Sequence, residues 1–231
     1  MKKLLCLSAL VISAILASSV TAQELDEFLY LPIVIKNWPP GPGVHVLSSN
    51  AFEPYSSSLY IVGEVRNNTS SNVDFVRINA TLRDSDGNVV DSDYSYSMID
   101  KLTRGMTSPF KVWFWDPPAW SSYELVVTWD TTTRQPYPLE VLNSTSYFNS
   151  YDDFHVVGEI RNQYSERRTF IKAFVTMYDA NGQVIGADYS YTNPDELDPG
   201  QTASFDTEVY AWKYQPDRDK VASHRLQVYD D

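Results

Sequence analysis

Two eight-residue stretches decide the fold: LYIVGEVR at residues 59–66 and FHVVGEIR at residues 154–161. In the first stretch apolar residues alternate with others, so that Leu59, Ile61 and Val65 share one face. A period of two is typical of a β-strand that packs one face on a hydrophobic core. The second stretch repeats that face with Phe154, Val156 and Ile160.

Both stretches belong to a longer internal repeat. Residues 46–115 match residues 141–210 without a gap at a constant offset of 95, and the run Asp93-Tyr94-Ser95-Tyr96 recurs as Asp188-Tyr189-Ser190-Tyr191. So long a match at one offset predicts two tandem domains. The expected boundaries are a leader at 1–22, a tether at 23–43, repeat 1 at 44–130, a linker at 131–137 and repeat 2 at 138–231.

Further strands with period two follow in each repeat. Val76, Ile78, Ala80 and Leu82 are expected to point inward, as are their counterparts 171, 173, 175 and 177. Asp84-Ser85-Asp86-Gly87 and Asp179-Ala180-Asn181-Gly182 then predict hairpin turns, in which glycine supplies a positive φ. Tyr94 and Tyr189 are expected to point inward on the returning strands. About seven short strands per repeat and no helical period predict two all-β, antiparallel, immunoglobulin-like β-sandwiches.

The order of motifs in each repeat resembles the FxLYD family of bacterial extracellular domains. The naming motif falls on Phe174-Val175-Thr176-Met177-Tyr178-Asp179, with one extra residue before the Tyr-Asp pair. The corresponding Asn79-Ala80-Thr81-Leu82-Arg83-Asp84 lacks both the Phe and the Tyr. The resemblance covers most of both repeats and implies a sandwich on the cell surface or outside the cell. It implies no catalytic residues.

The first 22 residues predict export. Lys2 and Lys3 precede an apolar run from Leu4 to Ala17, and Val20 and Ala22 stand where a signal peptidase reads small residues. The run is too short to span a membrane comfortably, so we expect no membrane span in the mature chain. The tether holds an apolar run at 28–35, which predicts either an edge strand laid on repeat 1 or a surface-attachment segment.

Charge narrows the classes of partner. The chain carries a net charge of −12, which argues against nucleic acid as a partner. Its single cysteine, Cys6, lies in the leader, so thiol catalysis and thiolate metal sites are excluded from the mature chain. Glu64 and Arg66, like Glu159 and Arg161, are expected outward on their strands, paired with neighbours and contributing little.

One cluster of oxygen ligands invites a calcium hypothesis. Asp84, Asp86 and Asn88 crowd one short loop, as Ca²⁺ ligands do. The glycine is fourth and not sixth in this loop, and no Glu closes it at position twelve, so an ordinary hairpin is the preferred interpretation. We therefore expect no cofactor, with Ca²⁺ as the alternative.

Aromatic side chains supply the second candidate site. If Phe110, Val112 and Phe114 face the core, then Trp113 and Trp115 face outward, and Trp120 follows shortly after. Exposed indoles often mark an interface or a platform on which sugar rings stack. The alternative is that the tether or the second repeat covers them.

The residues that could carry catalysis form no recognisable motif. His45, His155 and His224 lack metal-ligand spacing, and neither GxSxG nor a phosphate loop occurs. With 30 acidic residues a glycosidase carboxylate pair stays an open alternative. The sequence thus favours an exported, non-enzymatic module that binds an envelope protein or a polysaccharide. The alternatives are a carbohydrate-binding module that uses Trp113, Trp115 and Trp120, or a structural spacer of the cell envelope.

Overall fold

The computed structural model describes residues 41–55, 57–151, 153–209 and 221–230. The predicted leader and residues 23–40 of the predicted tether lie outside these described residues. Within them every regular element is a β-strand, and all strand pairs are antiparallel. The prediction of an all-β, antiparallel chain is confirmed, whereas the immunoglobulin-like refinement stays a prediction.

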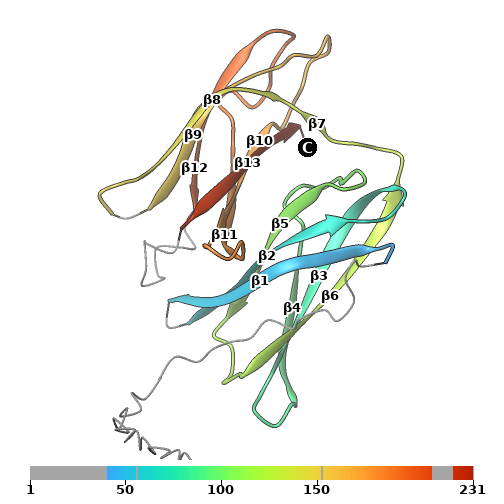
Figure 1. The fold of residues 1–231 in the computed structure, drawn as a ribbon, viewed down its shortest axis with the longest axis vertical. Helices are drawn as coiled ribbons and strands as arrows, with labels where there is room; N and C mark the ends of the chain where they lie inside the picture. Colours follow the sequence, from blue (N-terminus) through green and yellow to red (C-terminus); the bar gives the residue numbers. More distant parts are fainter. Residues whose placement is uncertain (1–40, 56, 152, 210–220, 231) are drawn as a thin grey trace, which may run out of the picture.

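The first unit is a sandwich of two three-stranded sheets (Figure 1). One sheet has the order β1-β2-β5 and the other β4-β3-β6. The strands are β1 (Val44–Tyr55), β2 (Ser58–Asn67), β3 (Asn72–Arg83), β4 (Val89–Tyr96), β5 (Thr107–Trp115) and β6 (Ser122–Thr132).

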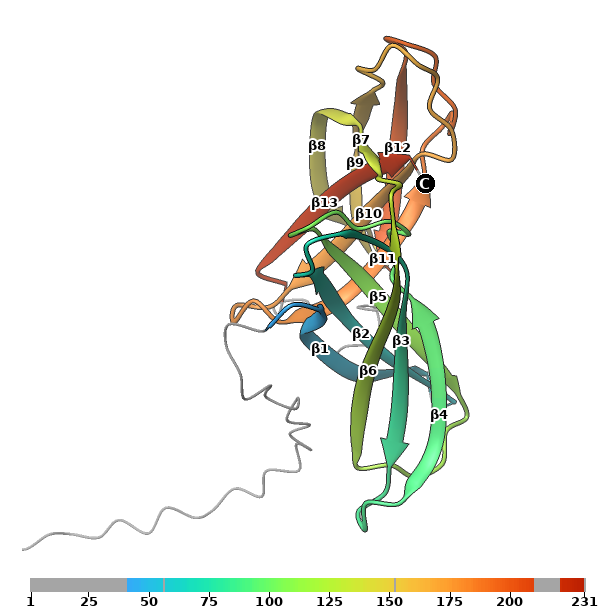
Figure 2. The ribbon, with the colours of Figure 1, turned by 90° about the vertical axis from the view of Figure 1, so that its right-hand side faces the viewer.

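The second unit repeats this arrangement and adds one short strand. Its sheets have the orders β8-β9-β12 and β11-β10-β13-β7, and the two units are stacked along the long axis of the molecule (Figures 1 and 2). The strands are β7 (Tyr137–Pro138), β8 (Glu140–Phe148), β9 (Phe154–Arg161), β10 (Lys172–Tyr178), β11 (Val184–Tyr191), β12 (Thr202–Val209) and β13 (Ser223–Asp230).

Each unit encloses its own core, built from the positions that the period of two predicts. Leu59, Ile61 and Val65 are completely buried in the first unit, together with Val76, Ile78, Ala80 and Leu82. Their counterparts in the second unit, among them Phe154 and Met177, form the second core. Tyr94 and Tyr189 were predicted inward, and this is wrong: they are 48% and 41% exposed. The register sets them opposite Asn79 and Phe174, which alternate with the core residues of β3 and β10, so both tyrosines lie on the outer face of their sheet.

Gly63 and Gly158 stand where no side chain fits. A Cβ at Gly63 would collide with the Phe110 ring and the Ser48 carbonyl, and one at Gly158 with the Phe205 ring and the Asn143 carbonyl. In both units the neighbouring strand has a bulge at this point, which brings its backbone close. The glycines therefore allow the core phenylalanine and the bulged strand to meet.

A buried asparagine ties three segments together in each unit. The Asn67 amide donates to the Ser71 and Leu102 carbonyls, both at 2.9 Å. Its carbonyl oxygen accepts from the Thr69 amide N–H at 2.9 Å. Asn162 does the same in the second unit, donating to the Glu166 and Leu197 carbonyls and accepting from the Tyr164 N–H.

The repeat loses its constant offset before the last strand. Tyr123 faces Leu82 across the β6–β3 pair, and His224 faces Met177 across the β13–β10 pair. The last strands are thus related by an offset of 101 and not 95, so equivalent positions of β12 and β13 lie six residues further apart in sequence than those of β5 and β6. Over the described residues we find no helix long and apolar enough to cross a membrane.

Substituting the buried asparagine tests its role in the fold. We expect Asn67→Ala to lower the free energy of unfolding by about 1–3 kcal/mol, because it leaves buried carbonyl groups without a donor. The measurement is the midpoint of urea unfolding. The neighbouring Asn68→Ala is the matched control, and an equal loss in both variants would contradict this role.

Candidate functional site

The two units meet at a junction centred on a buried carboxylate. Strand β11, with parts of β10 and β13, packs on the outer face of the β1-β2-β5 sheet (Figures 1 and 2). The Glu64 side chain is only 4% exposed there. It accepts a hydrogen bond from the Tyr178 hydroxyl at 3.0 Å and forms an ion pair with Arg225 at 2.5 Å. Glu64 thus faces outward from its own sheet and is paired, as predicted, but the second unit buries it, so it is not the exposed surface ion pair that the sequence analysis expects.

A second ion pair and an apolar anchor complete the junction. Lys111 Nζ lies 2.6 Å from Asp188 Oδ2, and both side chains are mostly buried. Phe174 projects from β10 into the core cluster of the first unit and is 1% exposed. Arg225 also donates to the Thr107 hydroxyl at 2.7 Å. Because the Glu64 carboxylate, the Phe174 ring and the Lys111–Asp188 pair are mostly shielded from water, these contacts hold one unit on the other.

An aromatic row lies on the same outer sheet face, beside the junction. We use this name for Phe52, Tyr60, Trp113 and Trp115. Successive ring centroids along the row are 5.9, 6.5 and 5.9 Å apart. Phe52 and Tyr60 face each other across β1 and β2, and Tyr60 faces Trp113 across β2 and β5. Trp113 and Trp115 are 50% and 67% exposed, and their ring planes meet at 82°, so each indole offers its own face to solvent.

Alternation along β5 predicts this outward placement of Trp113 and Trp115. Sequence reasoning missed Phe52 and Tyr60 as members of the row. The position of Tyr60 between Leu59 and Ile61 is enough to predict that it faces outward. The strand register that sets Tyr60 beside Trp113 cannot be predicted from the sequence pattern.

The structure separates Trp120 from the other two predicted tryptophans. Trp120 follows β5 and is half-buried against the core of the first unit, with its ring 6.3 Å from that of Tyr123. It is not part of the aromatic row.

The predicted calcium ligands lie in a hairpin turn between β3 and β4. Asp84 accepts hydrogen bonds from the backbone N–H groups of Asp86 and Asn88 at 2.9 Å, and from the Asn88 amide at 3.1 Å. These bonds, the one from the Asn88 side chain first, lower the pKa of Asp84. Asp179 accepts equivalent bonds in the second unit. In the described ranges no group of three or more His, Cys, Asp or Glu residues could hold a metal ion.

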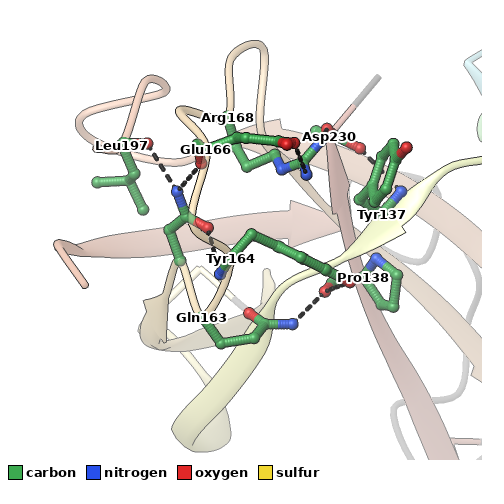
Figure 3. Close-up of polar contacts among 9 residues, drawn as sticks. Tyr137, Pro138, Gln163, Tyr164, Glu166, Arg168, Leu197 and Asp230 are labelled. Carbon is green, nitrogen blue, oxygen red and sulfur yellow. Dashed lines mark hydrogen bonds and ion pairs between the residues drawn. The ribbon is translucent and has the colours of Figure 1, made fainter. Parts of the chain in front are cut away.

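A buried arginine holds the linker to the second unit (Figure 3). The Arg168 guanidinium lies 3.8 Å from the ring centre of Tyr137 and 4.5 Å from that of Tyr164. It also pairs with Asp230 at 3.2 Å and Glu166 at 3.0 Å. Tyr137 begins strand β7, so this cluster anchors the segment that enters the second unit. Its charged groups bind one another, and we assign the cluster a structural role.

The two histidines of the second unit, His155 and His224, have different surroundings. His155 Nδ1 lies 2.8 Å from Asp206 Oδ1, its Nε2 lies 3.2 Å from the Asn149 amide, and its ring stacks on Tyr147. Both ring nitrogens thus have partners. Burial lowers the pKa of His224, which lines an open hollow of about 400 Å³ beside Tyr178 and Arg225.

Comparison with known proteins adds no family. No family model matches the chain, and no curated protein matches it. Among solved structures, a β-glucuronidase from glycoside hydrolase family 2 is similar, with 12% identity and a TM-score of 0.26. That match covers 67% of this chain, and the chain spans about a fifth of the enzyme's length (20%). The FxLYD resemblance stays a prediction.

The junction predicts alkaline sensitivity. Burial and the negative charge of Glu64 raise the pKa of Tyr178 above its usual value of 10.0. The folded protein thus holds this proton more tightly than the unfolded chain does, and the stability that Tyr178 contributes is present below pH 10 and is lost as pH rises above it. We expect Tyr178→Phe to cost about 1.5 kcal/mol at pH 8, measured by urea unfolding. The cost should shrink at pH 11, and an equal cost at both pH values would contradict this assignment.

Proposed function

We propose that this protein is an exported, non-catalytic binding module, and that its binding surface is the aromatic row of the first unit. The single observation that carries the proposal is the exposure of Trp113 and Trp115 on an ordered strand. Indole rings expose a large apolar area to water, which is unfavourable unless a ligand covers it for part of the time. Exposed aromatic rings stack on the flat faces of sugar rings, so the proposed ligand is a polysaccharide.

Charge favours a neutral polysaccharide. The chain has a net charge of −12, which repels acidic polymers. Lys111, a cation beside the row, is already paired with Asp188. An anionic ligand would therefore find no free partner in Lys111.

The second unit supports the assignment to the first. At the repeat offset Glu208 stands where the first unit has Trp113, and Tyr147 and His155 stand where it has Phe52 and Tyr60. A carboxylate in the middle of the row is hydrated and offers no stacking surface. The two units thus share a core but present different chemistry on the same sheet face.

A spacer is the second candidate function. The junction favours it, because Glu64, Arg225, Lys111 and Asp188 hold two sandwiches in one fixed arrangement. Such a body would keep an attached group at a constant distance from a surface.

Binding of neutral polysaccharides tests the primary proposal. We expect the protein to be retarded in gels that contain hydroxyethylcellulose, xylan or mannan, and not in gels that contain alginate. Trp113→Ala and Trp115→Ala should each weaken binding roughly tenfold, because each removes a stacking surface of about 1.4 kcal/mol.

The control is Tyr151→Ala, which truncates an aromatic residue that is 76% exposed and lies outside the row. If a variant that carries both Trp113→Ala and Trp115→Ala still binds, the assigned site is wrong. If none of the neutral polymers retards the protein, the carbohydrate proposal is wrong and the spacer is the function that is left.

A further inference from the structure

The junction joins two different faces, so among the described residues each molecule keeps one copy of each face outside the junction, which we call unused. The first unit contributes the outer face of β1-β2-β5, and the second contributes β11, β10 and β13. By the repeat, the second unit has an equivalent outer face on β8-β9-β12, and the first unit has equivalent strands β4, β3 and β6. Contacts between unlike faces propagate into open chains of molecules if nothing prevents them.

Both ion pairs of the junction would become like-charge pairs in such a contact. On the unused face, Glu159 is the counterpart of Glu64. On the unused strands, Glu124 is the counterpart of Arg225. Glu124 faces Thr81 in the first unit just as Arg225 faces Thr176 in the second. Asp206 replaces Lys111, and Asp93 replaces Asp188. The two ion pairs that hold the junction within one chain would be replaced by two pairs of like charges between two chains.

The apolar anchor is also missing from the unused strands. Phe174, which enters the core cluster of the first unit, has Asn79 as its counterpart. Asn79 donates from its side chain to the Val126 carbonyl at 3.2 Å, so it is a polar surface group. The acids have partners in their own unit as well: Asp206 with His155 at 2.8 Å, and Glu124 with Arg83 at 3.0 Å.

We infer that these differences between the two repeats block head-to-tail self-association. The protein therefore stays a single chain of two units. The unused face on β8-β9-β12 therefore excludes a second copy of this chain. It fits a sandwich unit that offers cations opposite Glu159 and Asp206. Like charges placed opposite each other are an established means of rejecting a wrong partner.

Two complementary variants test the inference. The first carries Asp206→Lys, which gives its unused face the charges of the junction. The second carries Glu124→Arg and Asn79→Phe, which give its unused strands the cation and the anchor. Each variant changes the net charge by the same amount, so the mixture differs from the separate proteins only in the pairing that it permits.

Sedimentation equilibrium measures the outcome. We expect the wild type and each variant alone to sediment as one chain, and the equimolar mixture to form a complex of two chains. Adding Glu159→Ala to the first variant should weaken that complex at least tenfold and so locate the contact. Circular dichroism and urea unfolding of each separate variant check that it is folded.

Three results would overturn the inference. They are self-association of the wild type at low salt, a mixture of folded variants that stays monomeric, and a complex that is insensitive to Glu159→Ala.

Discussion

The buried carboxylate of Glu64 constrains the relative position of the two sandwiches. A carboxylate removed from water is unfavourable unless charged and hydrogen-bonding groups surround it. Both of its partners at the junction, Arg225 and Tyr178, come from the second unit. The first unit alone would leave this face exposed to water, so the arrangement of the units and the burial of Glu64 depend on each other. The aromatic row, which lies on the same sheet face, is bounded by that arrangement.

The repeat keeps its cores alike and differs at its surfaces. Leu59 and Phe154, or Leu82 and Met177, differ in shape but fill equivalent interior positions. On the outer faces the substitutions change chemistry: Lys111 corresponds to Asp206 and Trp113 to Glu208. Interior positions need only volume and apolarity, whereas surface positions set which contacts form. Two nearly equal folds can thus take unequal parts in one molecule.

The sequence allows accurate prediction of the core and much less of the surface. Period two identifies buried residues such as Ile61 and Phe110 because an alternating strand has one dry face. It also places Trp113 and Trp115 outward. It fails for Tyr94 and Tyr189, because the register sets them opposite Asn79 and Phe174, on the outer face of their sheets. It places Glu64 outward from its own sheet, but it carries no information on what covers that face. Trp120 follows the end of a strand, where no period applies.

The junction and the aromatic row meet at one side chain. Lys111 pairs with Asp188 at 2.6 Å, and its ammonium group also lies 5.6 Å from the ring centre of Tyr60, the second member of the row. At the far side of the row Phe52 packs against the core cluster of the second unit. The second unit therefore orders part of a surface that belongs to the first. Binding to a surface that is already ordered costs less conformational entropy than binding to a surface whose side chains must first become fixed. Through the junction and through Phe52, the second sandwich thus supports the aromatic row that the first sandwich carries.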